Sequence, residues 1–278
     1  MAECLLIEEI PCENGDGVIA KVTINRPDKL NALNQDVVNA LKDMCAWVEE
    51  NDSVRCVVIT GAKPNPPPEG KRQKPNAFVA GADITEFAGK NSVQIKELFT
   101  DNAIEAIWNL SKPTIAMVDG FALGGGCEVA CSCDIRIASE RAIFGTPEIK
   151  LGLIPGYGGT QRLVHLVGYG RAMEMVMTGN NLSAEEAHRI GLANHVHSSD
   201  ELEEKTMEIA QTIATKSMNT LRVAKKTIRA ALDNGLTEGV KIEADAFASL
   251  FDTEDQEIGV QAFINREEAV WKLSLIHI

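Results

Sequence analysis

Two glutamates lie inside glycine-rich segments and could exchange a proton with a bound ligand. Glu128 ends the segment 120–128, GFALGGGCE, and Glu148 lies in the segment 144–162, FGTPEIKLGLIPGYGGTQR. Glycine lets backbone N–H groups come close to a ligand, and two neighbouring carboxylates can divide the removal and return of one proton. The pair therefore predicts acid–base chemistry beside a carbonyl group.

The elements that must position these glutamates can be read from hydrophobic periodicity. Strands are expected at 5–10, 18–25, 54–60, 77–79, 114–118 and 134–138, with a turn at 14–17 between the first two. Asn34 is expected to cap a helix that runs to Glu50, and Ser183 to cap another. Amphipathic helices are expected at 201–215, 221–232 and 238–251. This order favours an α/β core followed by a helical C-terminal region.

Composition excludes several classes of partner. The chain has 278 residues, of which 45% are hydrophobic, so it can bury a large core. Its net charge of −13 opposes non-specific binding to nucleic acid or an anionic membrane, and we expect neither as a partner. The chain lacks a run of about 18 apolar residues and a secretory leader, so we expect a soluble, cytoplasmic protein.

Seven cysteines, an odd number, fit a reducing compartment better than a disulfide framework. Cys127, Cys131 and Cys133 are close in sequence, but no histidine or second cysteine pair completes a metal site. We expect them to pack as small apolar side chains and expect no metal. A dinucleotide loop at 120–126 is also disfavoured, because the spacing is not GxGxxG.

Segment 63–76 is rich in proline and carries Lys63, Lys71, Arg72 and Lys74, which predicts an exposed loop. Two interpretations stay open: a solvated insertion, or a basic flap near an anionic ligand. The second is motivated by the segment 78–83, FVAGAD, that follows directly.

The last six residues, LSLIHI at 273–278, are suspected to be non-native. The codons CTG TCT CTT ATA CAC ATC would encode them and match the mosaic end of a common transposase sequencing adapter. We therefore assign no role to His277.

Taken together, several motifs resemble the enoyl-CoA hydratase (crotonase) family over roughly residues 5–270. These motifs are NRP at 25–27, LNAL at 30–33, FVAGADI at 78–84, GGGCE at 124–128, PE at 147–148 and IPGYGGTQR at 154–162. The resemblance implies a spiral of ββα units over 1–200 and a helical region at 201–272 that assembles trimers, often stacked as hexamers. It also implies an acyl-CoA thioester ligand, a role in fatty acid metabolism, and no cofactor beyond that substrate's coenzyme A.

Carried over by position, the resemblance implies a set of site residues. The N–H groups of Ala82 and Gly125 would form an oxyanion hole, and Glu128 and Glu148 would flank a catalytic water. The expected substrate contacts are Lys29, Leu30, Ala80, Asp83, Ile84 and Thr85 for coenzyme A, and Tyr157 for the acyl end. Asp83 could instead cap the following helix. A basic pair near the C-terminal helix is reduced here to Arg266, which puts that contact with a neighbouring subunit in doubt.

The residues and the resemblance favour a reversible short-chain enoyl-CoA hydratase. Adding water to a conjugated thioester sends charge to the thioester oxygen, which two aimed N–H donors and a helix N-terminus would stabilise. We expect Glu148 to exchange a proton with the α-carbon and Glu128 to activate water, although the sequence leaves that division open. Alternatives are an enoyl-CoA isomerase or another acyl-CoA enzyme of the family, and a non-catalytic RNA-binding or scaffold protein of the same fold.

Overall fold

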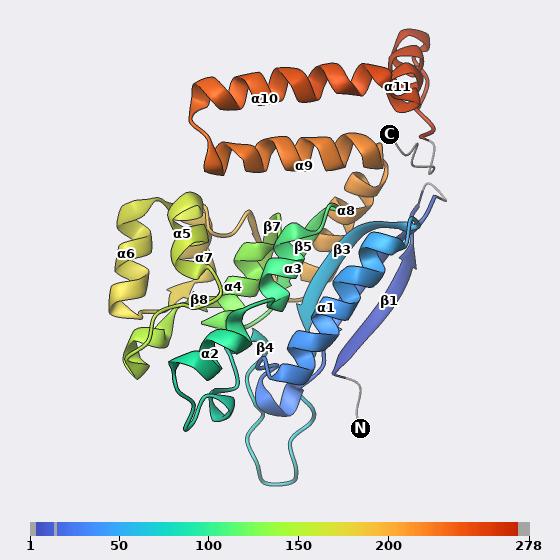
Figure 1. The fold of residues 1–278 in the computed structure, drawn as a ribbon. Helices are drawn as coiled ribbons and strands as arrows, with labels where there is room; N and C mark the ends of the chain where they lie inside the picture. Colours follow the sequence, from blue (N-terminus) through green and yellow to red (C-terminus); the bar gives the residue numbers. More distant parts are fainter. Residues whose placement is uncertain (1–3, 14–15, 272–278) are drawn as a thin grey trace.

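The fold is described from a computed structural model, which covers residues 4–13 and 16–271. Part of the expected turn at 14–17 and the suspected tail at 273–278 lie outside the described residues. Figure 1 shows a two-layered core of sheets and helices, with a separate helical arm formed by the C-terminal part of the chain.

The larger sheet has six strands in the order β1, β2, β3, β5, β7 and β10. β1 (Leu5–Pro11) and β2 (Val18–Ile24) pair antiparallel, and the remaining neighbours pair parallel. Those neighbours are β3 (Val54–Gly61), β5 (Thr114–Val118), β7 (Ile135–Ser139) and β10 (His195–His197). β3 is buried almost throughout, which explains its continuous apolar sequence, because parallel strands are covered on both faces.

A smaller sheet has four strands in the order β4 (Ala77–Val79), β6 (Phe121–Leu123), β8 (Ile143–Gly145) and β9 (Leu182–Ser183). Along the chain, β3 leads to β4, β5 to β6, and β7 to β8, so each consecutive pair gives one strand to each sheet. Helices follow each pair, for example α4 (Gly125–Ser132) directly after β6. This repeat is the ββα spiral that the resemblance implied.

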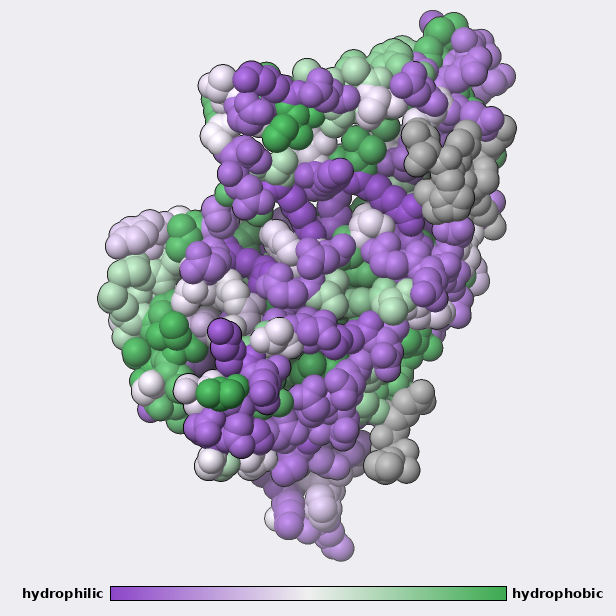
Figure 2. Space-filling view, viewed as in Figure 1, coloured by the Kyte–Doolittle hydropathy of each residue, from purple (hydrophilic) through white to green (hydrophobic). Residues whose placement is uncertain are grey.

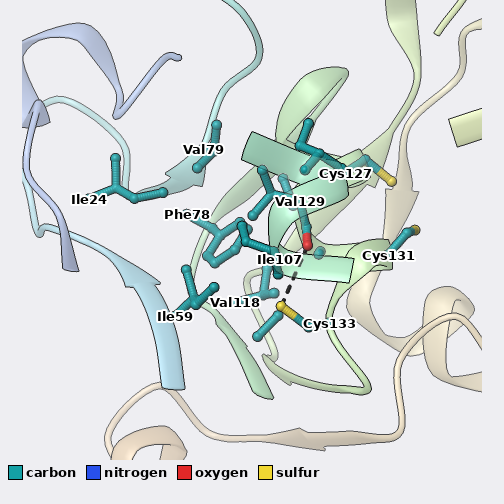
Figure 3. Packing of buried hydrophobic residues seen from close by; sticks show 14 of the residues in the cluster. Ile24, Ile59, Phe78, Val79, Ile107, Val118, Cys127, Val129, Cys131 and Cys133 are labelled. Atoms are coloured by element: carbon teal, nitrogen blue, oxygen red, sulfur yellow. Dashed lines mark hydrogen bonds between the residues drawn. The ribbon is translucent and has the colours of Figure 1, made fainter. Parts of the chain in front are cut away.

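Helices cover both faces of the larger sheet. α1 (Gln35–Glu50) packs with α3 (Ala103–Asn109) on one face, and α8 (Leu202–Ala214) packs on the other. Asn34 caps α1 as expected, since its side chain accepts from Val37 N–H. Figure 3 draws Cys127, Cys131 and Cys133 with other members of one buried apolar cluster, which also includes Phe78. The expected apolar packing of these cysteines is confirmed.

The C-terminal arm consists of α9 (Met218–Asp233), α10 (Leu236–Ser249) and α11 (Glu254–Asn265), with the 3₁₀ turn η4 (Leu250–Asp252) between the last two. α9 and α10 lie side by side and extend beyond the core (Figure 1). Neither contains a fully buried residue. The helices expected at 201–251 are confirmed within a few residues. A domain division after residue 200 stays a prediction, and α8 packs on the core sheet.

Residues 63–76 form a long loop that leaves β3 and returns into β4. Its basic residues Lys63, Lys71, Arg72 and Lys74 are exposed, as expected. Figure 1 shows the loop reaching away from the core at the end opposite the arm, and Figure 2 shows a largely hydrophilic surface there.

Candidate active site

Glu128 lies in the first turn of α4 and is only 1% exposed. Its Oε1 accepts hydrogen bonds from the backbone N–H of Tyr157 at 2.7 Å and of Gly159 at 2.8 Å. Both donors belong to the turn that enters α5 (Gly159–Val167). The turn therefore fixes Oε1 of the carboxylate, and Oε2 accepts no hydrogen bond from the turn.

Glu148 reaches the same place from the 3₁₀ turn η3 (Pro147–Leu151), which follows β8. Gly124 N–H donates to Gly145 O at 2.8 Å, so the segments that carry the two glutamates start side by side. A Cβ built on Gly124 would lie 2.8 Å from Glu148 Oε1, and Gly124 has a φ of 52°. Glycine is therefore required there by both contact and conformation. The structure brings the two predicted glutamates together.

Burial changes the acidity of both carboxyl groups. Loss of solvation raises the pKa of Glu128 to about 7, opposed by the N–H groups of Gly159 and Tyr157 and reinforced by the charge of Glu148. Burial also raises the pKa of Glu148. Among the described residues, Glu148 Oε2 is buried without a hydrogen-bond partner. A buried acceptor of this kind can bind a donor supplied by a ligand or by water.

Ala82 and Gly125 lie next to each other, as the predicted oxyanion hole requires. Leu33 forms a parallel bridge to Ala82: Leu33 N–H donates to Gly81 O at 2.9 Å, and Asp83 N–H donates to Leu33 O at 2.7 Å. Because neighbouring residues of a strand alternate in direction, Ala82 N–H points away from that bridge. A Cβ built on Gly125 would lie 3.5 Å from Ala82 N, an ordinary contact distance, so the two residues are direct neighbours.

The predicted coenzyme A contacts Leu30 and Ala80 are joined, since Ala80 N–H donates to Leu30 O at 3.0 Å. Lys29 ends the 3₁₀ turn η1 (Pro27–Lys29) and is exposed. Leu30 and Asn31 have φ values of 51° and 57°, an uncommon conformation for such residues. Buried Asn31 holds this turn by donating to Ala62 O and Ala77 O, at the two ends of the basic loop.

The structure does not support the expectation that Asp83 caps the next helix. It precedes the 3₁₀ turn η2 (Ile84–Glu86), but its side chain makes no capping hydrogen bond. Its carboxylate instead accepts from Thr85 Oγ1 at 2.7 Å and pairs with Arg26 at 3.2 Å, and the Thr85 bond is the main cause of its lowered pKa. Its contacts tie η2 to the segment before Leu30. Ile84 is 52% exposed.

Tyr157 belongs to an aromatic cluster that the sequence analysis did not find. Its ring stacks on Phe99 with 4.1 Å between centroids, and Phe99 lies 5.9 Å from Phe87. Phe99 ends α2 (Ser92–Phe99), and a Cβ built on Gly156 would lie 2.3 Å from its ring. Local sequence gives no sign of this contact, because α2 and the turn before α5 are far apart along the chain.

A cavity of about 670 Å³ lies elsewhere, between α9 and the core. Neither Glu128 nor Glu148 lines it, although it reaches Gly158 and Arg162 on the far side of the turn that binds Glu128. Within the described ranges, no group of three or more metal-ligating side chains occurs, and no helix combines the length and apolar character needed to cross a membrane.

The two-sheet spiral and the paired carboxylates define an α/β protein of the crotonase fold. A family model described as enoyl-CoA hydratase/isomerase matches residues 14–274, and the chain belongs to that family, as the motifs indicated.

Similar proteins are named for enoyl-CoA hydration. The chain is 41% identical over 255 residues to a short-chain-enoyl-CoA hydratase of Clostridium acetobutylicum, which covers 91% of this chain and 94% of that protein. It is 39% identical over 253 residues to a crotonyl-CoA hydratase of Syntrophomonas wolfei, covering 90% and 93%. The crystal structure of an enoyl-CoA hydratase from Bacillus anthracis superposes with a TM-score of 0.87 at 34% identity, covering 98% and 100% of the two chains.

Proposed function

We propose that this protein catalyses the reversible hydration of short-chain 2-enoyl-CoA thioesters to 3-hydroxyacyl-CoA. The observation that carries the proposal is the approach of Glu128 and Glu148 from two different turns, beside the neighbouring Ala82 and Gly125 amides. The names of the similar proteins support the same reaction.

In this proposal the thioester oxygen accepts hydrogen bonds from Ala82 N–H and Gly125 N–H. Glu128 takes a proton from water as the water oxygen bonds to C3, and the C2–C3 double bond shifts electrons toward the thioester oxygen. Glu148 then gives its proton to C2, and the charge returns from the oxygen. A proton must pass from Glu128 back to Glu148 before the next turnover. Donors aimed at the developing oxyanion are each worth about 3 kcal/mol of barrier in comparable sites.

The hydrogen bonds of the two carboxyl groups support this division of roles, although burial opposes it by raising the pKa of Glu128 to about 7. Two N–H donors stabilise negative charge on Glu128, whereas Glu148 Oε2 is buried without a partner, which favours a proton on Glu148. Repulsion between the two carboxylates favours a pair that shares one proton near neutral pH, and such a pair titrates as a unit. The hydration rate should therefore follow a bell-shaped pH profile.

Coenzyme A would lie along the joined segments 29–30 and 80–85. Lys29, Leu30, Ala80, Asp83, Ile84 and Thr85 would border its nucleotide and pantetheine, while Tyr157 would line the acyl end. The Leu30–Ala80 hydrogen bond and the Arg26–Asp83 ion pair support this proposal, because they hold both segments beside Ala82. The residues at the proposed site suit a reaction that needs no cofactor beyond the substrate's own coenzyme A.

A homotrimer or a hexamer of stacked trimers would bury the arm. Large apolar side chains are exposed on it, including Leu236 at 85% and Phe263 at 85%. Exposed apolar surface of this kind typically marks an interface. All seven cysteines are unpaired thiols, which supports a reducing compartment such as the cytoplasm.

The decisive experiment follows water and the double bond separately. Purified protein with crotonyl-CoA should lose the enoyl thioester absorbance, and mass spectrometry should find the product heavier by one water. An isomerase would move the double bond of a 3-enoyl-CoA without this gain.

Glu148→Gln should lower kcat about a hundredfold or more, since a general acid is removed, while the affinity for acetyl-CoA, a coenzyme A thioester that has no double bond to hydrate, stays within about twofold. Glu174→Gln, a change of the same kind at an exposed position of α6 (Tyr169–Thr178), is the matched control and should keep full activity. Full activity of Glu148→Gln would exclude the proposed site.

A further inference from the structure

We propose that Arg162 is a positioning residue for Glu128, acting through the backbone of the turn 157–159. The proposal rests on the hydratase function proposed above, but its main test reads the ionisation of Glu128 rather than turnover. Arg162 does not contact Glu128 through a hydrogen bond; it holds the backbone whose N–H groups do.

Arg162 is 8% exposed and lies one turn into α5. Its Nη1 donates to Tyr157 O at 2.8 Å. The N–H of the same residue, Tyr157, donates to Glu128 Oε1. A Cβ built on Gly158 would lie 2.4 Å from Arg162 Nη1, and Gly158 has a φ of 89°. The guanidinium thus fills the inner side of the turn, and the turn presents its N–H groups to Glu128 on the other side.

The guanidinium is itself fixed by α3. Its Nη2 donates to Glu105 Oε1 at 2.6 Å, and its Cζ lies 4.7 Å from the centroid of the Trp108 ring. Because Glu105 and Trp108 already fix the planar guanidinium, it loses little further conformational entropy when it binds the Tyr157 carbonyl. The Glu105 side chain is 47% exposed, so its contribution is through geometry more than through charge.

The same tryptophan links this cluster to the C-terminal arm. Arg229 of α9 stacks on the Trp108 ring at 4.0 Å and pairs with Asp134 at 2.8 Å. Lys225 of α9 also pairs with Asp134, at 2.7 Å. The arm therefore contacts the core at Trp108, which packs on Arg162, so two residues, Trp108 and Arg162, link the arm to the Glu128 turn.

The charged and titratable groups that face Glu128 come from several elements. Glu148 faces it from η3, Tyr157 from the turn before α5, and Arg162 from α5. Cys127 and Cys131 lie near it on its own helix, and Glu105 of α3 lies behind Arg162. Of these, Arg162 is the only one that contributes a positive charge and a hold on the turn.

The test titrates the Glu128 carboxyl by ¹³C NMR in protein labelled at glutamate side chains, with Glu128→Gln used to assign the resonance. In Arg162→Gln, the loosened turn and the lost positive charge should both move the Glu128 titration to higher pH. We also expect kcat for crotonyl-CoA hydration to fall tenfold to about a hundredfold, with KM within about twofold, because the proposed coenzyme A contacts lie elsewhere.

Three further variants separate positioning from general stability. Arg162→Lys keeps the charge but loses the fork, so most of the loss in kcat should persist. Glu105→Gln should change kcat and the titration in the same direction as Arg162→Gln, by less. Arg55→Gln removes another buried arginine that holds a carbonyl, Lys216 O at 2.7 Å, far from the site, and should lower Tm without moving the Glu128 titration.

The outcomes are distinct. An unchanged Glu128 titration in Arg162→Gln, or full recovery of both readouts in Arg162→Lys, would overturn the positioning role. If Arg162→Gln does not fold, wild-type values in both Arg162→Lys and Glu105→Gln would do the same. Failure of the wild-type protein to hydrate crotonyl-CoA would refute the proposed function instead, and the NMR titration would still report on Arg162.

Discussion

The burial of Glu128 lowers the stability of its ionised form and raises its pKa into the range that acid–base chemistry needs. An ionised carboxylate that is 1% exposed loses most of its hydration, and the two N–H donors to Oε1, together with the charge of Arg162, offset part of that loss. The result is a pKa of about 7 instead of the ordinary 4.5. A carboxyl group that titrates near neutral pH can both take and return a proton at useful rates, which the proposed reaction requires of it.

This raised pKa predicts a pH-dependent stability. A group whose pKa is higher in the folded than in the unfolded state stabilises the fold below pH 4.5, and that contribution is lost as the pH rises through about 7. Glu128→Gln, which cannot ionise and keeps an oxygen for the two N–H groups, should unfold at higher urea concentration than wild type at pH 8. The gain should reach at most about 3 kcal/mol and shrink toward pH 5.

Urea unfolding at both pH values and at one protein concentration checks this expectation. Glu174→Gln, at an exposed position, is the control and should match wild type at both pH values. A Glu128→Gln protein that is less stable than wild type at pH 8, or equally stabilised at both pH values, would show that burial does not penalise the charge as we argue.

Among the structural elements, those with strong local signals could be predicted from the sequence. The continuous apolar run was sufficient to predict β3, and the Asn34 cap was sufficient to predict the start of α1, because each signal lies within a few residues. The glycines at 124 and 125 indicated the candidate site, because they lie within a few residues of Glu128. Contacts between distant elements were not predictable: Phe99 on Tyr157 and Arg162 on Trp108 depend on how α2, α3 and α5 pack.

α2 is the element that we expect to limit acyl length. It has no fully buried residue, yet its last side chain, Phe99, stacks on Tyr157 beside the Glu128 turn. Phe99→Ala should raise kcat/KM for trans-2-octenoyl-CoA relative to crotonyl-CoA by at least about fourfold, since each additional buried methylene is worth about 0.8 kcal/mol. Phe247→Ala on the exposed arm should leave that ratio unchanged. The idea fails if both variants give the wild-type ratio.

The basic loop at 63–76 is the element that we expect to attract the coenzyme A phosphates. Asn31 fastens its two ends beside the turn that carries Lys29 and Leu30, and Lys74 donates to Asp28 O at 2.8 Å in that turn. Replacing Lys71, Arg72 and Lys74 by alanine should raise KM for crotonyl-CoA about tenfold at low salt and less at high salt, with kcat retained.

Crotonyl-pantetheine, which lacks the nucleotide phosphates, separates this effect from a general loss of fold. Its KM should be the same for the loop variant and wild type. The matched control removes three positive charges elsewhere, by Arg171→Ala, Arg189→Ala and Lys205→Ala on α6, α7 (Ala184–Arg189) and α8. Equal KM changes in the control and in the loop variant would contradict a role of the loop in attracting coenzyme A. Segment 63–76 would then be a solvated insertion.

At the scale of the whole molecule, the arm is the part whose arrangement the sequence could not determine. Periodicity gave its helices, but amphipathic helices fold back on a core or extend from it with similar sequences. The structure shows α9 touching the core through Arg229 and Lys225, while α10 lies outside it (Figure 1). In Figure 2, hydrophobic residues are visible on this arm among hydrophilic ones.

The arrangement of α10 predicts that assembly depends on one face of that helix. Leu236, Val240 and Phe247 are 85%, 53% and 64% exposed, and their spacing puts them within about 40° of one another around the helix. Val240→Glu would place a charge in the middle of that stripe, and burying an unpaired charge costs several kcal/mol. Light scattering after size exclusion should therefore show a smaller assembly than wild type. Lys241→Glu adds an acidic side chain one residue away, on a different face of the helix, and should keep the wild-type mass. A loss of assembly in both variants, or in neither, would show that the stripe is not the contact between subunits.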